Sequence, residues 1–182
     1  MASIEDLSKY ITGEMRFNVD SPEARQIRLL QRSPPSLPLA LALWAYLVWP
    51  ENKWDHKPPI NRKFGMWCFD PATKTEYYGD IWSNVHYGYI GLSVGFGEHT
   101  LKMGAGVAQA LKSGLVDTFG SECKKSGGAL ACLPAFDDPK DQVSIKIGFE
   151  LWKTYGRNLT ASTVCDKVRS NRARLSTRRK SS

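Results

Sequence analysis

Helix-start signals recur along the 182-residue chain and constrain its fold more than any other feature. Ser3 with Asp6 resembles a capping box, and apolar residues follow at helical spacing to about residue 17. Ser21-Pro22 and Asp138-Pro139 each place an N-cap residue before a proline at the first helical position. These signals predict helices over about 4–17, 22–31 and 139–155, the last ending at Gly156.

The middle of the chain differs in composition. Two short aromatic-rich segments, 63–69 and 74–78, flank the type I turn signal Asp70-Pro71-Ala72-Thr73 and predict a β-hairpin. The glycines of segment 80–97 are expected to allow close packing of a helix, and 98–112 is also expected to be helical. We therefore predict a single, mainly α domain over residues 1–166, α+β at most, with a small central β-hairpin.

The longest apolar run, LPLALALWAYLVW at 37–49, contains thirteen residues. A membrane-spanning helix needs about 20 residues, so this run predicts a buried helix and no membrane insertion. The first twenty residues are interrupted by charges and contain no apolar core of a signal peptide. We expect a protein that is cytoplasmic as synthesised and that leaves the cell, if at all, by a non-classical or effector-secretion route.

The net charge of +7 is concentrated at the C-terminus. Residues 167–180 hold seven of the 25 basic residues and no acid, so the remaining 18 basic residues balance the 18 acidic ones. The composition of 167–182 predicts a disordered basic tail. It is either a solvated terminus or a segment that binds nucleic acid or another polyanion.

Four cysteines leave the redox state open. Cys123 and Cys132 bracket a glycine-rich loop that a disulfide could close, with Cys68 and Cys165 as a second pair. The alternative is four reduced thiols in a cytosolic protein. No CxxC or paired-histidine spacing is present, so we predict no metal site and no cofactor.

Two of the three histidines are candidates for catalysis. His56 lies in the segment WDHKPP beside Lys57, and His86 lies in NVHYG beside Tyr87. Two imidazoles and a cation are what RNA cleavage needs: one base, one acid and one group that stabilises the phosphorane. The competing interpretation is two histidines that only hydrogen-bond in packed turns. His99 is predicted to be a surface residue.

Carboxylates support other chemistries. Glu14 flanks the apolar stripe of the first helix, and burial would raise the pKa of such a carboxyl enough for it to act as a general acid. Asp80 or Asp55 could then be the second carboxylate of a glycosidase. The acids at 137, 138 and 141 could hold Mg²⁺ with Asp80, although capping of the helix start explains Asp138 and Asp141 equally well.

Four separated motifs resemble one family. YITGEMRFNVDS, WDHKP, DIWSNVHYGYIG and DDPKDQVSIKIGFELWKTYG, over about 9–156, are similar in content and order to the bacterial polymorphic toxin type 44 domain. The resemblance implies a toxin, with nuclease activity a prediction for the class. The positions that match its motifs are Glu14, Asp55, His56, Lys57, Asn84, His86, Asp138 and Asp141.

The favoured function is therefore a toxin-type hydrolase that cleaves RNA. His56, His86 and Lys57 are its predicted catalytic residues, with Glu14 the acid of the alternative reaction, and Asp55, Asn84, Tyr87 and Asp141 contact the substrate. The first alternative is a lysozyme-like peptidoglycan glycosidase that acts on bacterial cell-wall glycan. The second is a non-enzymatic interaction protein with a nucleic-acid-binding tail. A toxin also implies a cognate immunity protein in the producing cell.

Overall fold

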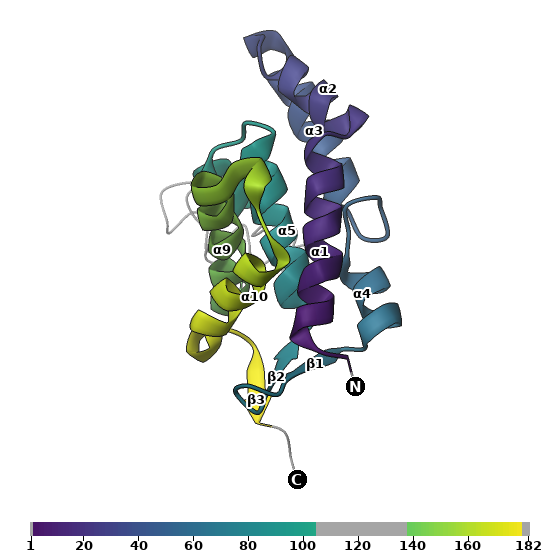
Figure 1. The fold of residues 1–182 in the computed structure, drawn as a ribbon. Helices are drawn as coiled ribbons and strands as arrows, with labels where there is room; N and C mark the ends of the chain where they lie inside the picture. The colour runs from purple at the N-terminus through teal and green to yellow at the C-terminus, as the bar shows by residue number, and fades with distance from the viewer. Residues whose placement is uncertain (1, 105–137, 180–182) are drawn as a thin grey trace, which may run out of the picture.

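The fold is mainly helical, as predicted, with a small antiparallel sheet at one end (Figure 1). The computed structural model describes residues 2–104 and 138–179. The helices with described bounds are α1 (Ile4–Val19), α2 (Pro22–Leu30), α3 (Leu37–Val48), α4 (Lys57–Phe64), α5 (Asp80–Ser93), α9 (Pro139–Tyr155) and α10 (Ala161–Ser170). Residues 98–104 are also helical, as expected for the start of 98–112. The strands are β1 (Trp67–Asp70), β2 (Thr75–Tyr78) and β3 (Thr177–Arg179), and the short 3-10 helices are η1 (Pro34–Ser36), η3 (Gly156–Asn158) and η4 (Arg172–Arg174).

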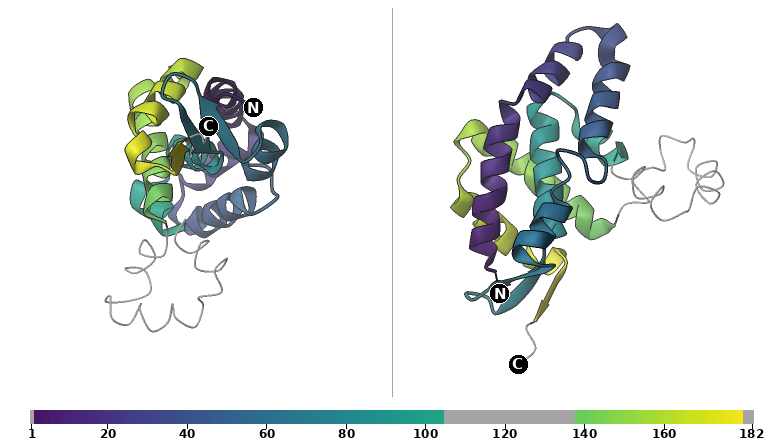
Figure 2. Two further views of the ribbon diagram at one scale, coloured as in Figure 1. Left: turned by 90° about the horizontal axis from the view of Figure 1, so that it is seen from below. Right: turned by 90° about the vertical axis from the view of Figure 1, so that its right-hand side faces the viewer.

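Helices α5 and α9 form the centre of the core, and α1 packs along α5 on its other side (Figures 1 and 2). Two glycines permit the close approach of α5 and α9. A Cβ atom at Gly148 would lie inside van der Waals contact with the backbone of Val85 and Tyr89, and one at Gly88 would overlap the carbonyl group of Ile145. The prediction that glycines in segment 80–97 allow close helix packing is confirmed at Gly88.

Substitution of Gly148 by alanine is expected to destabilise the fold by about 2–3 kcal/mol, because the methyl group has to push two backbones apart. Gly13→Ala is the matched control: Gly13 is exposed on α1 with no atom near its Cβ position. Alanine there should stabilise the helix by up to about 1 kcal/mol. Urea unfolding of both variants measures the difference, and equal stabilities would contradict the close packing of α5 and α9.

The sheet has the order β1-β2-β3 and joins the middle of the chain to its C-terminus. The predicted hairpin pairs Trp67 with Tyr78 and Asp70 with Thr75, and β3 then pairs Arg178 with Glu76. The predicted disorder of the tail is therefore wrong for residues 167–179. Helix α10 runs across the expected boundary at 166/167, and β3 completes the sheet. Tertiary ion pairs, which composition does not reveal, hold this basic segment.

Helix α3 is not the buried helix that its apolar run predicts. One face is buried through Ala40, Trp44 and Leu47, whereas Leu39 and Tyr46 are exposed. Figure 2 shows why: α2 and α3 form the end of the molecule away from the sheet, so only one side of α3 has a neighbour among residues 2–104 and 138–179. No helix among the described residues is long and apolar enough to cross a bilayer.

The segment WDHKPP is a helix start. Pro58 and Pro59 occupy the first turn of α4, where a missing backbone N–H costs nothing, and His56 is the N-cap residue. Helix α4 was not predicted from the sequence, where a strand was expected from residue 63.

The cysteines give a partial answer on redox state. Cys68 and Cys165 are buried free thiols, so the proposed pair between them is not formed. Burial raises the pKa of Cys68 to about 11 and also raises that of Cys165. Both thiols are therefore protonated at neutral pH. Cys123 and Cys132 lie outside the described residues.

Candidate active site

His56 and His86, thirty residues apart in sequence, are in direct contact. Their Nε2 atoms are 3.1 Å apart, and their ring centroids are 4.1 Å apart with planes inclined by 68°. The start of α4 supplies His56, and the middle of α5 supplies His86. Only 2% of His56 and 1% of His86 is exposed to solvent. The two predicted histidines thus form one buried pair.

Helix α1 completes a four-residue network around this pair. The Tyr10 hydroxyl lies 3.4 Å from His56 Nδ1, and the Asn18 amide nitrogen lies 3.0 Å from His86 Nε2. With Tyr10 and Asn18 as donors, His56 donates through its Nε2–H, and His86 Nε2 is the shared acceptor. The hydrogen of His86 is then on Nδ1, a buried atom without a hydrogen-bond partner among the described residues.

Glu14 lies on the same face of α1 as these two groups. It follows Tyr10 by four residues and precedes Asn18 by four, a spacing that aligns side chains along a helix. Burial raises the pKa of Tyr10 to about 12, and the negative charge of Glu14 adds to the effect. The Glu14 side chain is half-buried. The structure therefore places Glu14 beside the histidine network, although Glu14 makes no contact with either ring that defines a role.

A second polar row lies next to His56. Lys57 Nζ pairs with Asp80 at 3.1 Å, and the Asn84 amide donates to Asp141 at 2.8 Å. Asp80 and Asn84 are one turn apart on α5, whereas Asp141 is in the first turn of α9. Three of the four motifs identified in the sequence therefore meet here.

The electrostatics of this row keep Lys57 charged. Burial alone would lower the pKa of Lys57, but the charges of Asp80, Asp141 and Asp55 outweigh it, and the pKa is raised. Lys57, which directly follows His56 in the sequence, is thus a permanent cation.

Two further predicted residues serve to hold the site in shape. The Asp55 carboxylate accepts the backbone N–H groups of Lys57 at 3.1 Å and Glu51 at 2.9 Å, which fixes the turn before His56. The Tyr87 hydroxyl donates to the Leu101 carbonyl at 2.8 Å, and its ring packs 5.1 Å from that of Trp44. His99 is exposed, as predicted.

Carboxylates do not gather into a metal-binding cluster in the described part of the chain. Asp138 caps α9 by accepting the Lys140 N–H at 2.8 Å, and Asp141 bonds Asn84. Asp137 lies outside the described residues.

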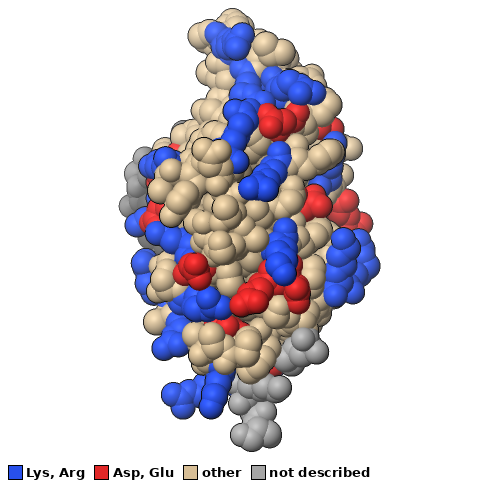
Figure 3. Space-filling model, in the orientation of Figure 1, with Lys and Arg blue, Asp and Glu red and all other residues tan. Residues whose placement is uncertain are grey.

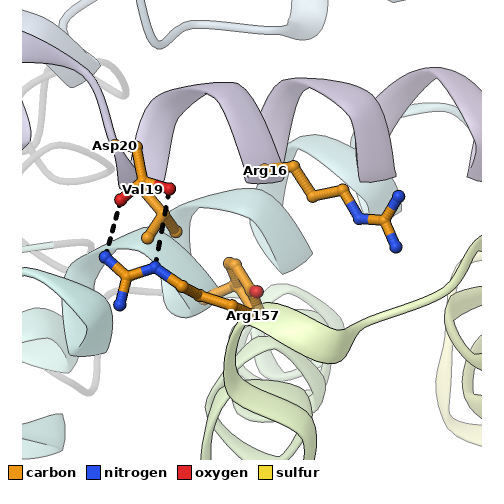
Figure 4. Close-up of a pocket in the computed structure, with 5 residues that line it drawn as sticks. Arg16, Val19, Asp20 and Arg157 are labelled. Atoms are coloured by element: carbon orange, nitrogen blue, oxygen red, sulfur yellow. Dashed lines mark hydrogen bonds and ion pairs between the residues drawn. The ribbon is translucent and has the colours of Figure 1, made fainter.

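A pocket of about 220 Å³ lies on another side of α1 (Figure 4). Its polar groups are satisfied within the protein: Arg157 pairs with Asp20 at 2.6 Å, and Arg16 donates to the Leu159 carbonyl. Val19 and Tyr89 complete the lining. No residue predicted for the site lines this pocket, so it is not part of the histidine site. The contacts of Arg157 and Arg16 join η3 to α1.

Both histidines of the pair are neutral at neutral pH. Burial lowers the pKa of His56 to about 4 against the opposing charge of Asp55. Burial and the neighbouring His56 hold the pKa of His86 well below its usual value. A buried neutral pair of this kind can pass a proton between its rings but resists taking up an extra one.

Acidification should therefore destabilise the protein. The folded-state pKa of His56 lies below its unfolded value of about 6.5, so between pH 6.5 and 4 the unfolded chain binds more protons. Stability is full above pH 6.5 and is lost as pH falls toward 4, by about 3 kcal/mol for His56 alone. Urea unfolding at several pH values should give a steeper pH dependence for the wild type than for His56→Gln. Identical slopes would contradict a neutral buried His56.

The buried histidine pair and the adjacent cation lie in a small, mainly helical domain. The family model for bacterial toxin 44 matches residues 43–154, more than half of the chain, and the chain belongs to this family. No curated protein and no solved structure matches the chain.

The matched range extends from α3 to the end of α9 and includes the histidine pair, Lys57 and Asp141. Helix α1, with Tyr10, Glu14 and Asn18, lies before it, although the first of the four motifs was assigned to the same family. Sequence reasoning missed Tyr10 and Asn18. Their spacing of four residues on either side of Glu14 was the available signal.

Proposed function

We propose that this toxin is a nuclease that cleaves RNA with His56 and His86 as its acid–base pair. The observation that carries the proposal is the 3.1 Å separation of the two Nε2 atoms. Two imidazoles at this distance are close enough to serve one phosphodiester, one at the 2′-hydroxyl and the other at the leaving 5′-oxygen.

The hydrogen-bond network supports a division of roles. His56 donates through its Nε2–H and, once protonated to imidazolium, is the candidate acid. His86, whose Nε2 lone pair accepts from His56 and Asn18, is the candidate base once the rings part. Lys57 retains N–H groups beyond its bond to Asp80 and would stabilise charge on the phosphorane. Asp55 positions His56 and Lys57 through the turn, and Asn84 and Asp141 hold the neighbouring polar row.

Substrate binding has to part the two rings, because both are buried and occupy each other's Nε2 atoms. A phosphate between them adds negative charge, which raises the pKa of both imidazoles toward the range useful for acid–base catalysis. Tyr10 and Glu14 are half-buried on α1, and the Tyr10 hydroxyl lies 3.4 Å from His56 Nδ1. Tyr87, packed on Trp44, orients the helix segment that bears His86.

The alternative is a peptidoglycan glycosidase with Glu14 as the general acid, favoured by the half-buried position of Glu14 beside the pair. It needs a second available carboxylate. Asp55 is engaged by two backbone N–H groups and Asp80 by Lys57, so neither is free to act as the second group. We therefore rank this reaction below RNA cleavage.

The deciding experiment incubates purified protein with total RNA, plasmid DNA and peptidoglycan, each with and without EDTA. RNA cleavage that His56→Ala abolishes and Glu14→Gln preserves is the expected result. Intact RNA with solubilised peptidoglycan, lost in Glu14→Gln, would establish the glycosidase. No hydrolysis of any substrate would favour the non-enzymatic interaction protein. As a family member of this kind, the toxin is also proposed to require a cognate immunity protein in the producing cell.

A further inference from the structure

We propose that the C-terminal basic segment is a folded docking surface for single-stranded RNA. The surface, named the basic face, consists of Arg172, Arg174, Arg178 and Arg179 on η4 and β3. The inference rests on the proposed function for its ligand and adds to it a substrate-binding surface outside the range that matches the toxin family.

Charge on the basic face is only partly neutralised. Residues 167–179 contain six basic side chains and no acid. Three of them pair with acids of the body: Lys167 with Glu150, Arg169 with Asp70 and Arg178 with Glu76. The other three, Arg172, Arg174 and Arg179, are exposed and form no ion pair with the described residues.

The paired cations hold the unpaired ones in place. Arg178 is fixed twice, by Glu76 at 2.6 Å and by the Trp67 ring, whose centroid is 4.1 Å from its guanidinium carbon. Leu175, which is 3% exposed, anchors the chain between η4 and β3. Figure 3 shows Lys and Arg side chains gathered at the lower left of the molecule, where α10 and β3 lie in Figure 1. Cations on an ordered backbone lose less entropy when they bind a phosphate backbone than cations on a disordered tail.

Aromatic surface lies beside these cations. Trp67 and Tyr78 are a cross-strand pair with ring centroids 5.2 Å apart, and both are half-buried. Basic side chains next to partly exposed aromatic rings are the combination that binds single strands, through phosphates and stacked bases.

A nucleic acid fits the basic face better than an anionic membrane does. Stable attachment to a membrane needs exposed apolar side chains next to the basic ones. Residues 160–179 contain no exposed large apolar side chain. Met66, next to β1, is exposed, but most such side chains lie in α2 and α3, at the opposite end of the molecule. The phosphates of a flexible single strand can bind to the cations without any contact to apolar side chains.

The test measures binding of a labelled 20-nucleotide oligouridylate by fluorescence anisotropy, in a His56→Ala background that prevents cleavage. The triple variant Arg172→Ala, Arg174→Ala, Arg179→Ala should bind at least about tenfold more weakly at 100 mM salt. The slope of log K against log salt should fall by about 2, since each lost phosphate contact contributes about 0.7 for single strands.

The control triple variant Arg25→Ala, Arg32→Ala, Lys146→Ala removes the same charge from exposed positions elsewhere. It should bind RNA within about threefold of its parent. Equal weakening in both triple variants would overturn the basic face, because net charge alone would explain it. Loss of binding to phosphatidylserine vesicles, with RNA binding unchanged, would overturn it in favour of a lipid surface.

The outcomes separate this inference from the proposed function. Cleavage of RNA by the wild type together with undiminished RNA binding by the Arg172 triple variant would reject the basic face and leave the nuclease intact. Loss of binding in that variant, with no RNA cleavage by the wild type, would support the basic face and reject the nuclease.

Discussion

Replacement of His56 by alanine is expected to lower the rate of RNA cleavage by about 10²–10⁴-fold, the range typical for loss of one group that transfers a proton in the transition state. The change removes the donor that lies 3.1 Å from His86 Nε2 and leaves that atom with Asn18 as its neighbour. Initial rates on a fluorophore-quencher RNA measure the effect. His86→Ala should have an effect of similar size, because the two rings act on one phosphodiester.

His99→Ala is the matched control, since it removes the third histidine of the chain from an exposed helix start. Its rate should stay within about twofold of the wild type. Because His56 is buried, His56→Gln is measured alongside as a variant that fills more of the space. Far-UV circular dichroism checks that each variant is folded at the assay temperature. A folded His56 variant with a rate near that of the wild type would remove His56 from the mechanism.

Tyr10→Phe separates positioning from chemistry. The hydroxyl lies 3.4 Å from His56 Nδ1, a long hydrogen bond whose loss should cost less than tenfold in rate. Its expected signature is a shift in the pH–rate profile, because Tyr10 selects which nitrogen of His56 carries the proton. A structural role alone would lower stability and leave that profile unchanged.

Local signals predicted the helices and tertiary contacts decided the rest. The starts of α1, α2 and α9 followed from Ser3, Ser21-Pro22 and Asp138-Pro139, because capping needs only residues within one turn. Helix α3 was correct in type and wrong in burial, since a helix that is apolar on every side does not reveal which side has a neighbour. Strand β3 was missed because its stability depends on Glu76, about a hundred residues earlier.

In the candidate site, too, residue types were predictable from the sequence and tertiary contacts were not. Residue type alone singled out His56, His86 and Lys57, because few side chains combine a usable pKa with a phosphate-binding charge. Their contact was not predictable from sequence, since it depends on how α4 docks against α5. Asp80 was considered as a catalytic carboxylate or as a magnesium ligand, whereas its observed partner is Lys57. Pairing of a lysine at a helix start with an acid on another helix leaves no periodic signal.

Loss of Arg169 is expected to be the most destabilising single change on the surface of the fold. Its guanidinium donates to both oxygens of Asp70, at 2.9 and 3.1 Å, and the Asp70 side chain is 0% exposed. Burial alone would raise the pKa of Asp70, but hydrogen bonds from Arg169 and Thr73 outweigh it and hold the pKa below its usual value. Arg169→Ala leaves a buried carboxylate without its cation, which costs about 3–5 kcal/mol.

Urea unfolding at pH 7 measures this loss. Arg172→Ala is the control, because it removes the same charge from an exposed position without an ion pair among the described residues. It should change the free energy of unfolding by less than about 0.5 kcal/mol. The direction in which the stability changes with pH also follows from the pKa of Asp70. Because the folded-state pKa of Asp70 is lowered, its contribution is full above the unfolded pKa of about 3.9 and is lost as the pH falls through the folded value. The double variant Asp70→Ala, Arg169→Ala should be less destabilised than the sum of the single variants. Additive effects would mean that the two residues stabilise the fold independently, and the C-terminal segment would then need another anchor to the sheet.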